Sequence, residues 1–381
     1  MWAPTPTKGG TQMTTRFDNA SLDDGPLLTG PEGISPEWLT TVLCRSGAIS
    51  HPVATCHISR FAEGSALLSR LYRVRLGYAS LNARGPRTVV VKLASNEPEQ
   101  LIVAEVLGLY QREAFVYRQL SEQLPYRTPT CYLAVAAEHG RATTLVVEDL
   151  AACSSVDQIA GAPWRVVTDC IDAMAAQHTT WSDVRQLEGL GDVLWSLAHP
   201  VYPAALSLLF EPGWEVAREV LAGTIDTRLA EFADRWSTEC GRLLQRLGRE
   251  PTLLHGDWRA DNLLYDHNEL VVVDFQIAGT GSGAYDLAYF ISQSVASEVR
   301  RPHHREIVGR YVGALEARGV RRDRRTVWDD YRAALLVCLV YPIAAFRSWD
   351  SQNERGRALI KRMLSRAVDA IEATGALRLL G

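Results

Sequence analysis

The sequence lacks the features that mark secreted, membrane-spanning or nucleic-acid-binding proteins. Its seven cysteines are scattered, with no CxxC pair and no histidine at ligand spacing, so we expect reduced thiols in a cytoplasmic protein. The longest apolar run, 333–345, is too short for a membrane span and contains Pro342, which favours a buried helix. The first residues lack the apolar core of a signal peptide. A net charge of −4 gives no reason to expect nucleic acid or an anionic membrane as a partner.

The residue pattern divides the chain into a leader and two lobes. Residues 1–30 are rich in Pro, Gly, Thr and Asp, and we expect a flexible leader there. Residues 31–148 contain short β-branched or alternating segments around one helical segment, which predicts a small sheet-rich lobe. Residues 149–381 have helical spacing almost throughout, which predicts a larger helical lobe. The predicted fold class is therefore α+β, with two lobes.

Hydrophobic periodicity also predicts the elements of each lobe. In the small lobe we expect a helix that begins after Ser35, one helix over 97–123, and strands over 54–61, 69–78, 87–94, 130–137 and 143–148. In the large lobe we expect two short strands within 252–276 and helices over 164–181, 189–210, 213–247, 285–299, 303–318, 326–348 and 353–376.

The most informative stretch is HGDWRADNLLYDHNELVVVDFQ at 255–276. Asp257, Asn262 and Asp274 have the side-chain types and spacing that phosphoryl transfer from a metal-bound nucleotide requires. One carboxylate orients the attacking hydroxyl, while an amide and a second carboxylate hold Mg²⁺ against the phosphates. A short hairpin between Asn262 and Asp274 would bring both side chains to one cation. The stretch therefore predicts a phosphoryl-transfer site.

Two other residues of this stretch have competing interpretations. Arg259 could reach the transferring phosphate and offset its developing charge, or it could form a structural ion pair. We expect His255 to pack and hydrogen-bond within the loop and not to act as a base.

The motif HGD, the asparagine that follows it and the Asp-Phe after a hydrophobic strand resemble the aminoglycoside phosphotransferase and choline kinase superfamily. The variant DFQ, together with AMAAQHTTW at 173–181, is similar to the ecdysteroid-kinase-like subgroup. The resemblance covers about residues 50–350. It implies a bilobal protein-kinase-like fold, ATP and Mg²⁺ as cofactors, and phosphorylation of a small-molecule hydroxyl.

The resemblance also assigns roles to individual residues of the large lobe. It implies that Asp257 is the catalytic aspartate and that Asn262 and Asp274 are the metal ligands. Asp286, in AYDLAYF, corresponds to an aspartate that braces the catalytic loop, so we expect structural support from it.

In the small lobe the resemblance implies a nucleotide site. Lys92, in TVVVKLAS, matches the lysine that binds the nucleotide phosphates, and Glu113 matches the carboxylate that pairs with it. Glu105 is the competing carboxylate. The segment VVEDL matches the hinge whose backbone binds adenine, and its expected contacts are Glu148, Asp149 and Leu150.

The expected phosphate loop, AEGSALLSR, departs from the family pattern because it has a single glycine, Gly64. Backbone N–H groups must approach phosphates closely, which usually needs several glycines. Ser65 and Ser69 could supply hydroxyls instead. The glycine-rich run at 279–283 matches no phosphate-binding motif, and we expect a flexible loop there.

These observations favour an enzyme that transfers the γ-phosphate of ATP to an antibiotic or a metabolite alcohol. A protein kinase is excluded because only about ten residues separate DFQ from the next predicted helix. A catalytically silent nucleotide-binding regulator stays an alternative. For the acceptor we favour a modestly polar alcohol, with an aminoglycoside or a choline-like amino alcohol as the alternative class. ATP against GTP as donor and the oligomeric state stay open.

Overall fold

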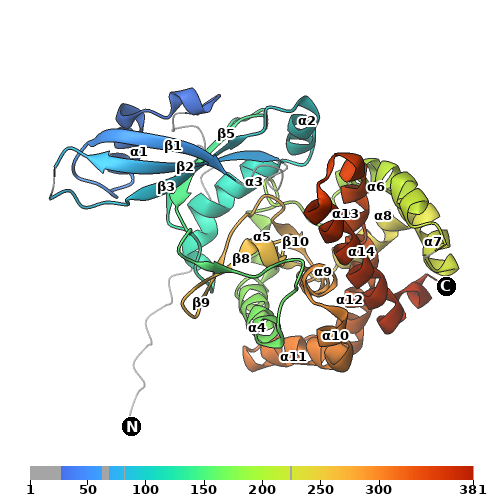
Figure 1. Ribbon diagram of the computed structural model, residues 1–381. Coiled ribbons are helices and arrows are strands. Elements are labelled where there is room, and N and C mark those ends of the chain that lie inside the picture. The colour runs from blue at the N-terminus through green and yellow to red at the C-terminus, as the bar shows by residue number, and fades with distance from the viewer. Residues whose placement is uncertain (1–26, 62–67, 81, 224, 381) are drawn as a thin grey trace, which may run out of the picture.

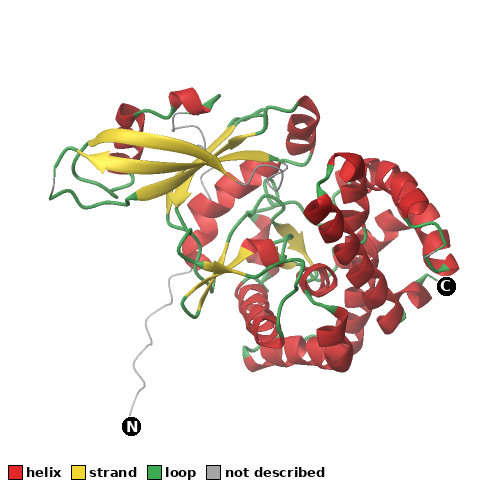
Figure 2. Cartoon of the chain, in the orientation of Figure 1, coloured by secondary structure: helices red, strands yellow, loops and turns green. Residues whose placement is uncertain are grey.

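The protein is described by a computed structural model that covers residues 27–61, 68–80, 82–223 and 225–380. A small sheet-rich lobe lies beside a larger helical lobe (Figures 1 and 2). The chain passes from the first lobe to the second after Glu148. Most of the predicted leader lies outside the described residues.

The small lobe contains a five-stranded antiparallel sheet. Its strands, in spatial order, are β1 (Val53–Phe61), β2 (Ser69–Tyr78), β3 (Thr88–Ala94), β5 (Thr143–Glu148) and β4 (Cys131–Ala136). Each begins and ends within one residue of its predicted position. Lys92 of β3 pairs with Leu71 of β2 and Leu145 of β5, so it lies on the central strand. Helix α1 (Pro36–Arg45) packs near β1, and the Ser35 side chain caps it as expected.

The helix expected over 97–123 is interrupted. The structure has α2 (Pro98–Val106), α3 (Leu109–Phe115), a π-helical turn (Val116–Leu120) and a short 3₁₀ turn (Ser121–Gln123). The break lies at Gly108, whose φ of +62° is left-handed and ends a helix. The prediction of one continuous helix was therefore wrong. As a result α3 lies beneath the sheet, at the junction with the large lobe (Figure 1).

Helices make up most of the large lobe. They are α4 (Trp164–Thr180), α5 (Val184–Glu188), α6 (Val201–Val220), α7 (Thr227–Asp234), α8 (Trp236–Leu247), α9 (Ala284–Ser294), α10 (Ser297–Arg300), α11 (His304–Ala317), α12 (Arg324–Cys338), α13 (Val340–Ala345) and α14 (Glu354–Thr374). Between α8 and α9 lie five short elements of the active-site region. They are β7 (Thr252–Leu254), a 3₁₀ turn (Ala260–Asn262), β8 (Leu263–Asp266), β9 (Glu269–Val272) and β10 (Gly279–Gly281).

Two predicted helices, 189–210 and 213–247, were wrong. Helix α6 runs through Pro212, where the sequence suggested a break, and the following Gly213 lets it pack closely on α13. Residues 189–200 form no continuous helix because Ser196 bridges to Thr280 instead. Helices α7 and α8 divide the second predicted segment.

The glycine-rich run at 279–283 begins as a buried strand and not as a flexible loop. Strand β10 pairs antiparallel with β7, the strand that leads into residues 255–262. A side chain at Gly279 would meet the carbonyl of Trp195 at 2.7 Å. These glycines therefore serve close packing.

The apolar stretch around 333–345 lies within α12 and α13. In the described part of the chain, Arg324–Ser351 is long and apolar enough to cross a membrane, but most of it is buried. Helix α12 contacts α8, α9 and α14, as expected of a core helix.

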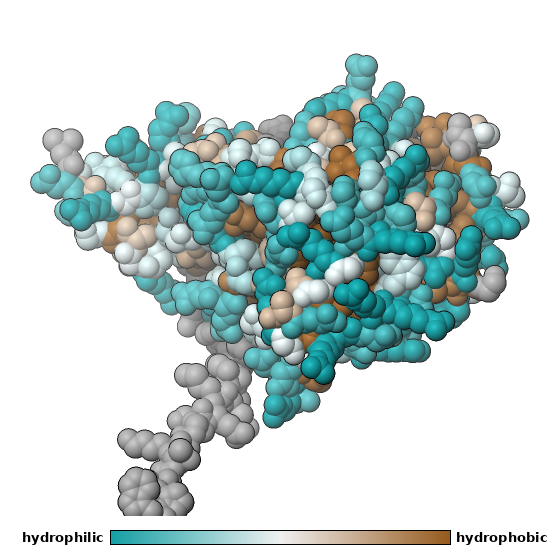
Figure 3. All heavy atoms as spheres, turned by 90° about the horizontal axis from the view of Figure 1, so that it is seen from below, coloured by the Kyte–Doolittle hydropathy of each residue, from teal (hydrophilic) through white to brown (hydrophobic). Residues whose placement is uncertain are grey.

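The face of the molecule in Figure 3 is mostly hydrophilic, with apolar residues scattered over it.

Candidate active site

The predicted catalytic loop, residues 255–262, begins where β7 ends and turns sharply at Gly256. This residue has a φ of +84°, and a Cβ atom there would lie 2.2 Å from the carbonyl oxygen of Ile277. Only glycine fits both the left-handed backbone and the close approach. The turn therefore fixes the backbone immediately before Asp257.

Asp286, in the first turn of α9, braces this loop from below. Its carboxylate is fully buried and accepts hydrogen bonds from the amides of His255 and Gly256, both at 2.9 Å. The Nε2 atom of His178 lies 3.3 Å from the same carboxylate. A buried carboxylate needs such partners. The structure thus places Asp286 in the supporting position expected for it.

His255 links the catalytic loop to the strand that precedes Asp274. Its Nδ1 atom accepts a hydrogen bond from the amide of Asp257 at 3.1 Å, and its Nε2 atom donates to the carbonyl of Val273 at 3.1 Å. Burial lowers the pKa of His255, which favours the neutral ring that this pattern requires. Its role is packing and hydrogen bonding.

The two carboxylate oxygens of Asp257 have different surroundings. Its Oδ2 atom lies 3.2 Å from Nε of Arg259, whereas its Oδ1 atom is buried and has no hydrogen-bond partner among the described residues. The Asp257 carboxylate raises the pKa of Arg259. Arg259 also lies 3.7 Å from Asp261, so the structure places it in ion pairs beside Asp257. A buried acceptor without a partner is costly in a folded protein and needs an explanation.

Asn262 and Asp274 come together through the hairpin of β8 and β9. Leu263 is paired with Val272, and the amide of Val273 donates to the backbone carbonyl of Asn262 at 3.1 Å. The side-chain amide of Asn262 donates to the carbonyl of Asp257 at 3.0 Å, so its side-chain oxygen faces away from that bond. Asp274 has a φ of +68°, a left-handed conformation that is uncommon outside glycine and functional sites.

These two oxygen donors fit a magnesium ion. No group of three or more His, Cys, Asp and Glu side chains gathers within the described ranges in a way that could hold a metal. Mg²⁺ needs no such group, because it is commonly bound by one or two protein oxygens, water and the phosphates of its nucleotide. Asn262 and Asp274 would hold the ion, and the ion would offset charge on the phosphates.

Lys92 is shared between two carboxylates, one from each lobe. Its Nζ atom lies 2.7 Å from Oε1 of Glu113 and 3.1 Å from Oδ1 of Asp274. Burial disfavours its charge, but Asp274 and Glu113 together raise the pKa of Lys92 above its usual value. One lysine cannot neutralise both the buried Glu113 and the partly exposed Asp274, and burial raises the pKa of Glu113 to about 7. The competing Glu105 is instead paired with Arg141 at the surface.

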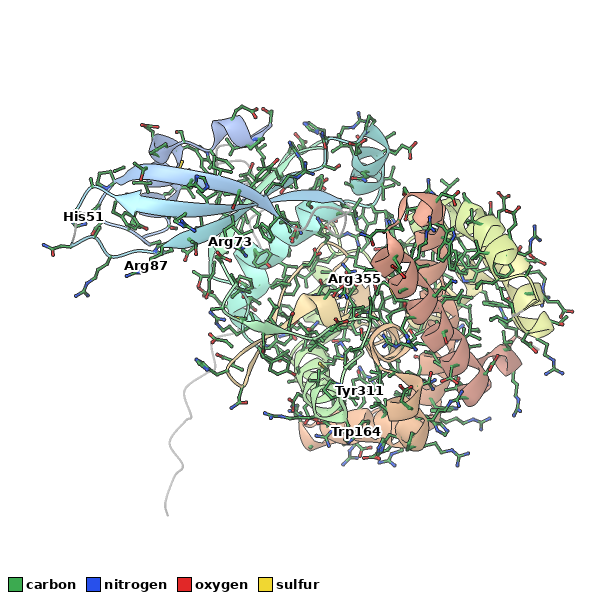
Figure 4. All side chains as sticks on the ribbon, viewed as in Figure 1. His51, Arg73, Arg87, Trp164, Tyr311 and Arg355 are labelled. Carbon is green, nitrogen blue, oxygen red and sulfur yellow. The ribbon has the colours of Figure 1, made fainter. Side chains whose placement is uncertain are left out.

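The predicted hinge residues are engaged in pairs of their own. The Glu148 carboxylate contacts Arg127 and accepts from the amide of Thr130 at 3.1 Å. Asp149 lies 2.8 Å from Nε of Arg73, a side chain of β2 labelled in Figure 4. Any adenine contact here would therefore come from the backbone.

The remaining contacts of the hinge and of the expected phosphate loop are partly described. The carbonyl of Leu150 accepts from the amide of Cys153 at 2.9 Å. Gly64 and Ser65 lie outside the described residues. Ser69, at the start of β2, accepts a hydrogen bond from Nε2 of Gln276 at 3.0 Å, so the DFQ motif reaches the base of this loop.

Sequence reasoning missed three residues that join the site to its surroundings. Gln276 was noted only as a variant of the motif. Gln158 accepts from the amide of Ala260 at 2.8 Å and supports the catalytic loop, although 102 residues separate them. Arg112 is almost fully buried next to Glu113. Its only signal in the sequence was its position next to Glu113.

The comparisons with known proteins agree with this geometry. The model of the ecdysteroid kinase-like family matches residues 203–320. No curated protein matches the sequence significantly. The family match confirms the predicted resemblance.

Solved structures share the fold at low sequence identity. A candidate aminoglycoside phosphotransferase from Ralstonia eutropha is 14% identical with a TM-score of 0.51, over 88% of this chain and 98% of that one. Choline kinase from Cryptosporidium parvum is 12% identical with a TM-score of 0.52, over 86% and 91%. Ethanolamine kinase from Plasmodium vivax is 9% identical with a TM-score of 0.50, over 82% of each chain. The bilobal kinase-like fold is confirmed.

Proposed function

We propose that the protein is a small-molecule kinase that transfers the γ-phosphate of Mg-ATP to an alcohol. The hydroxyl oxygen of the acceptor would attack the γ-phosphorus, the bond from that phosphorus to the bridging oxygen would break, and ADP would leave. The hydroxyl proton would pass to Asp257. Asn262 and Asp274 would hold the metal, and Lys92 would bind the phosphates.

The observation that carries this proposal is the buried Oδ1 atom of Asp257. No described residue donates a hydrogen bond of normal length to it, although the Tyr289 hydroxyl lies close to the carboxylate, and Arg259 holds the other oxygen. A hydroxyl group of an acceptor would satisfy it. The similarity of the fold to kinases of choline and ethanolamine supports the same reaction type.

We propose a modestly polar alcohol as the acceptor, in preference to a polycationic aminoglycoside. Of the three carboxylates that could meet a polycation, Asp329, Asp330 and Asp350, two are already engaged. Asp330 lies 2.8 Å from Nε of Arg246, and Asp329 lies 3.3 Å from Nη1 of Arg332. Near Asp257 lies the aromatic Tyr289, whose pKa is raised by burial and by the Asp257 carboxylate.

ADP release from Mg-ATP, measured across a library of alcohols and aminoglycosides, tests the proposal. Asp257→Asn should lower turnover by about 10²–10⁴-fold without changing the melting temperature, because it removes the proton acceptor. Asp266→Asn, at the half-exposed end of β8, is the matched control and should keep wild-type turnover. Full turnover in Asp257→Asn would exclude this mechanism. Nucleotide binding without turnover of any acceptor would indicate a silent regulator.

A further inference from the structure

Arg112 is a buried cation that bridges the two lobes without a carboxylate partner. Its side chain is almost fully buried in α3, and within the described residues it forms no ion pair. Its Nη1 atom donates to the hydroxyl of Tyr202 at 2.5 Å and to the carbonyl of Ala278 at 3.3 Å. Burying a guanidinium group without a counter-ion costs free energy of folding, so we infer that Arg112 has a role that offsets this cost.

Aromatic rings of the large lobe replace the missing carboxylate. The guanidinium carbon lies 4.5 Å from the ring centre of Trp195 and 5.6 Å from that of Tyr202. A desolvated cation is attracted to such ring faces. Trp195 is fixed in turn, because its carbonyl accepts from the amide of Thr280 at 3.0 Å and its ring stacks on His199.

The position of Arg112 connects this cluster to the nucleotide lysine. Its neighbour in the sequence, Glu113, binds Lys92, and Ala278 follows Asp274 by four residues. Helix α3 thus contacts Lys92 of β3 through Glu113. Through the neighbouring Arg112 it contacts the segment that follows Asp274.

We propose that Arg112 is a positioning residue that fixes α3 against the large lobe and so holds Glu113 on Lys92 before any ligand binds. The proposal rests on the proposed function only in using nucleotide binding as one readout. It predicts an active site that is assembled in the free protein and needs no swing of α3.

A double-mutant cycle on Mg-ADP affinity, measured by calorimetry, tests this coupling. Arg112→Met and Glu113→Gln should each raise the Kd by about tenfold or more, and the double variant should raise it no further, since both act through Lys92. A purely structural role for Arg112 would make the two effects multiply. Multiplying effects, or wild-type affinity in folded Arg112→Met, would overturn the proposal.

A matched control separates this role from general destabilisation. Arg300 is also fully buried and pairs with Asp369, far from α3 in the sequence and the fold. Arg300→Met should lower the melting temperature but leave the Kd within about twofold of wild type. If Arg112→Met fails to fold, Tyr202→Phe removes one hydrogen bond, keeps the ring, and should raise the Kd in the same direction.

Amide hydrogen exchange provides a readout that needs no nucleotide. Arg112→Met should accelerate exchange in residues 109–115 and 276–280, and Arg300→Met should not. Unchanged exchange in both segments would overturn the proposal. If the wild-type protein does not bind Mg-ADP, the proposed function fails, and exchange alone then decides the role of Arg112.

Discussion

The two halves of the candidate active site are held in different ways. In the large lobe, the start of the catalytic loop is held by the amides of His255 and Gly256, which donate hydrogen bonds to the buried carboxylate of Asp286. Between the lobes, the side chains of Lys92 and Arg112 make the contacts, and each cation is shared among several partners. The start of the loop depends on the one Asp286 carboxylate, with Gln158 supporting the loop further on, whereas Lys92 and Arg112 each have more than one partner.

Because of this difference, we expect substitutions in the first half to affect folding and substitutions in the second half to affect ligand binding. Asp286 satisfies amides that would otherwise be buried without a partner, so its loss should affect folding itself. Lys92 keeps one carboxylate when the other is removed, so loss of Asp274 should affect ligand binding much more than folding.

The largest expected effect is therefore that of Asp286→Asn. The side-chain amide would direct an N–H group at a backbone donor, and we expect unfolding free energy to fall by about 3–5 kcal/mol. Urea unfolding measures this loss. The same substitution at Asp274 should cost about 1 kcal/mol or less, because Lys92 keeps Glu113 and asparagine tolerates a left-handed φ. Equal losses of unfolding free energy in Asp286→Asn and Asp274→Asn would contradict the distinction between the two halves of the site.

Gly256→Ala tests how rigid the catalytic loop is. The added methyl group would collide with the carbonyl of Ile277 in a left-handed turn, so we expect a loss of about 1–3 kcal/mol and lower turnover. Gly309 is the matched control, since it lies inside α11 with no atom within 4 Å of an added Cβ. Gly309→Ala should raise stability by about 0.5–1 kcal/mol. Calorimetric melting compares them, and a tolerated Gly256→Ala would show that the loop can yield.

The same contrast explains which parts of the site the sequence predicted. Asp257, Asn262 and Asp274 lie within 18 residues, and one hairpin joins them, so local spacing was enough. The five strands of the small lobe were placed closely because alternation is a local signal. Arg112 and Ala278 are 166 residues apart, and no pattern in either segment indicates that they meet.

The wrong helix boundaries have a tertiary cause as well. The predicted helices 189–210 and 213–247 left a gap at 211–212, yet α6 continues through Pro212 because its packing on α13 outweighs the loss of one backbone donor. Residues 189–200 were expected to be helical, but Ser196 within them forms a bridge to Thr280 of β10. Local helix propensity therefore gave the wrong boundaries where tertiary contacts decide the conformation.

The smallest expected effect concerns pH and the cluster around Arg112. Burial and the nearby Arg112 lower the pKa of His199, whose Nδ1 atom accepts from the amide of Val201 at 3.4 Å. As the pH falls through about 6.5, His199 of the unfolded chain binds a proton more readily than His199 of the folded protein. The free energy of unfolding therefore decreases as the pH falls through this value. The lost stability should appear as a lower melting temperature at pH 5.5 than at pH 7.5.

His199→Phe keeps a ring on Trp195 and removes the titrating group. The drop in melting temperature between pH 7.5 and 5.5 should be smaller than in wild type by about 1–2 °C, while replacement of the exposed His57 by Phe serves as the control. A drop as large as that of wild type would show that the contacts around Arg112 do not sense this proton. In that case the contrast between the two halves of the site would rest on Lys92 alone.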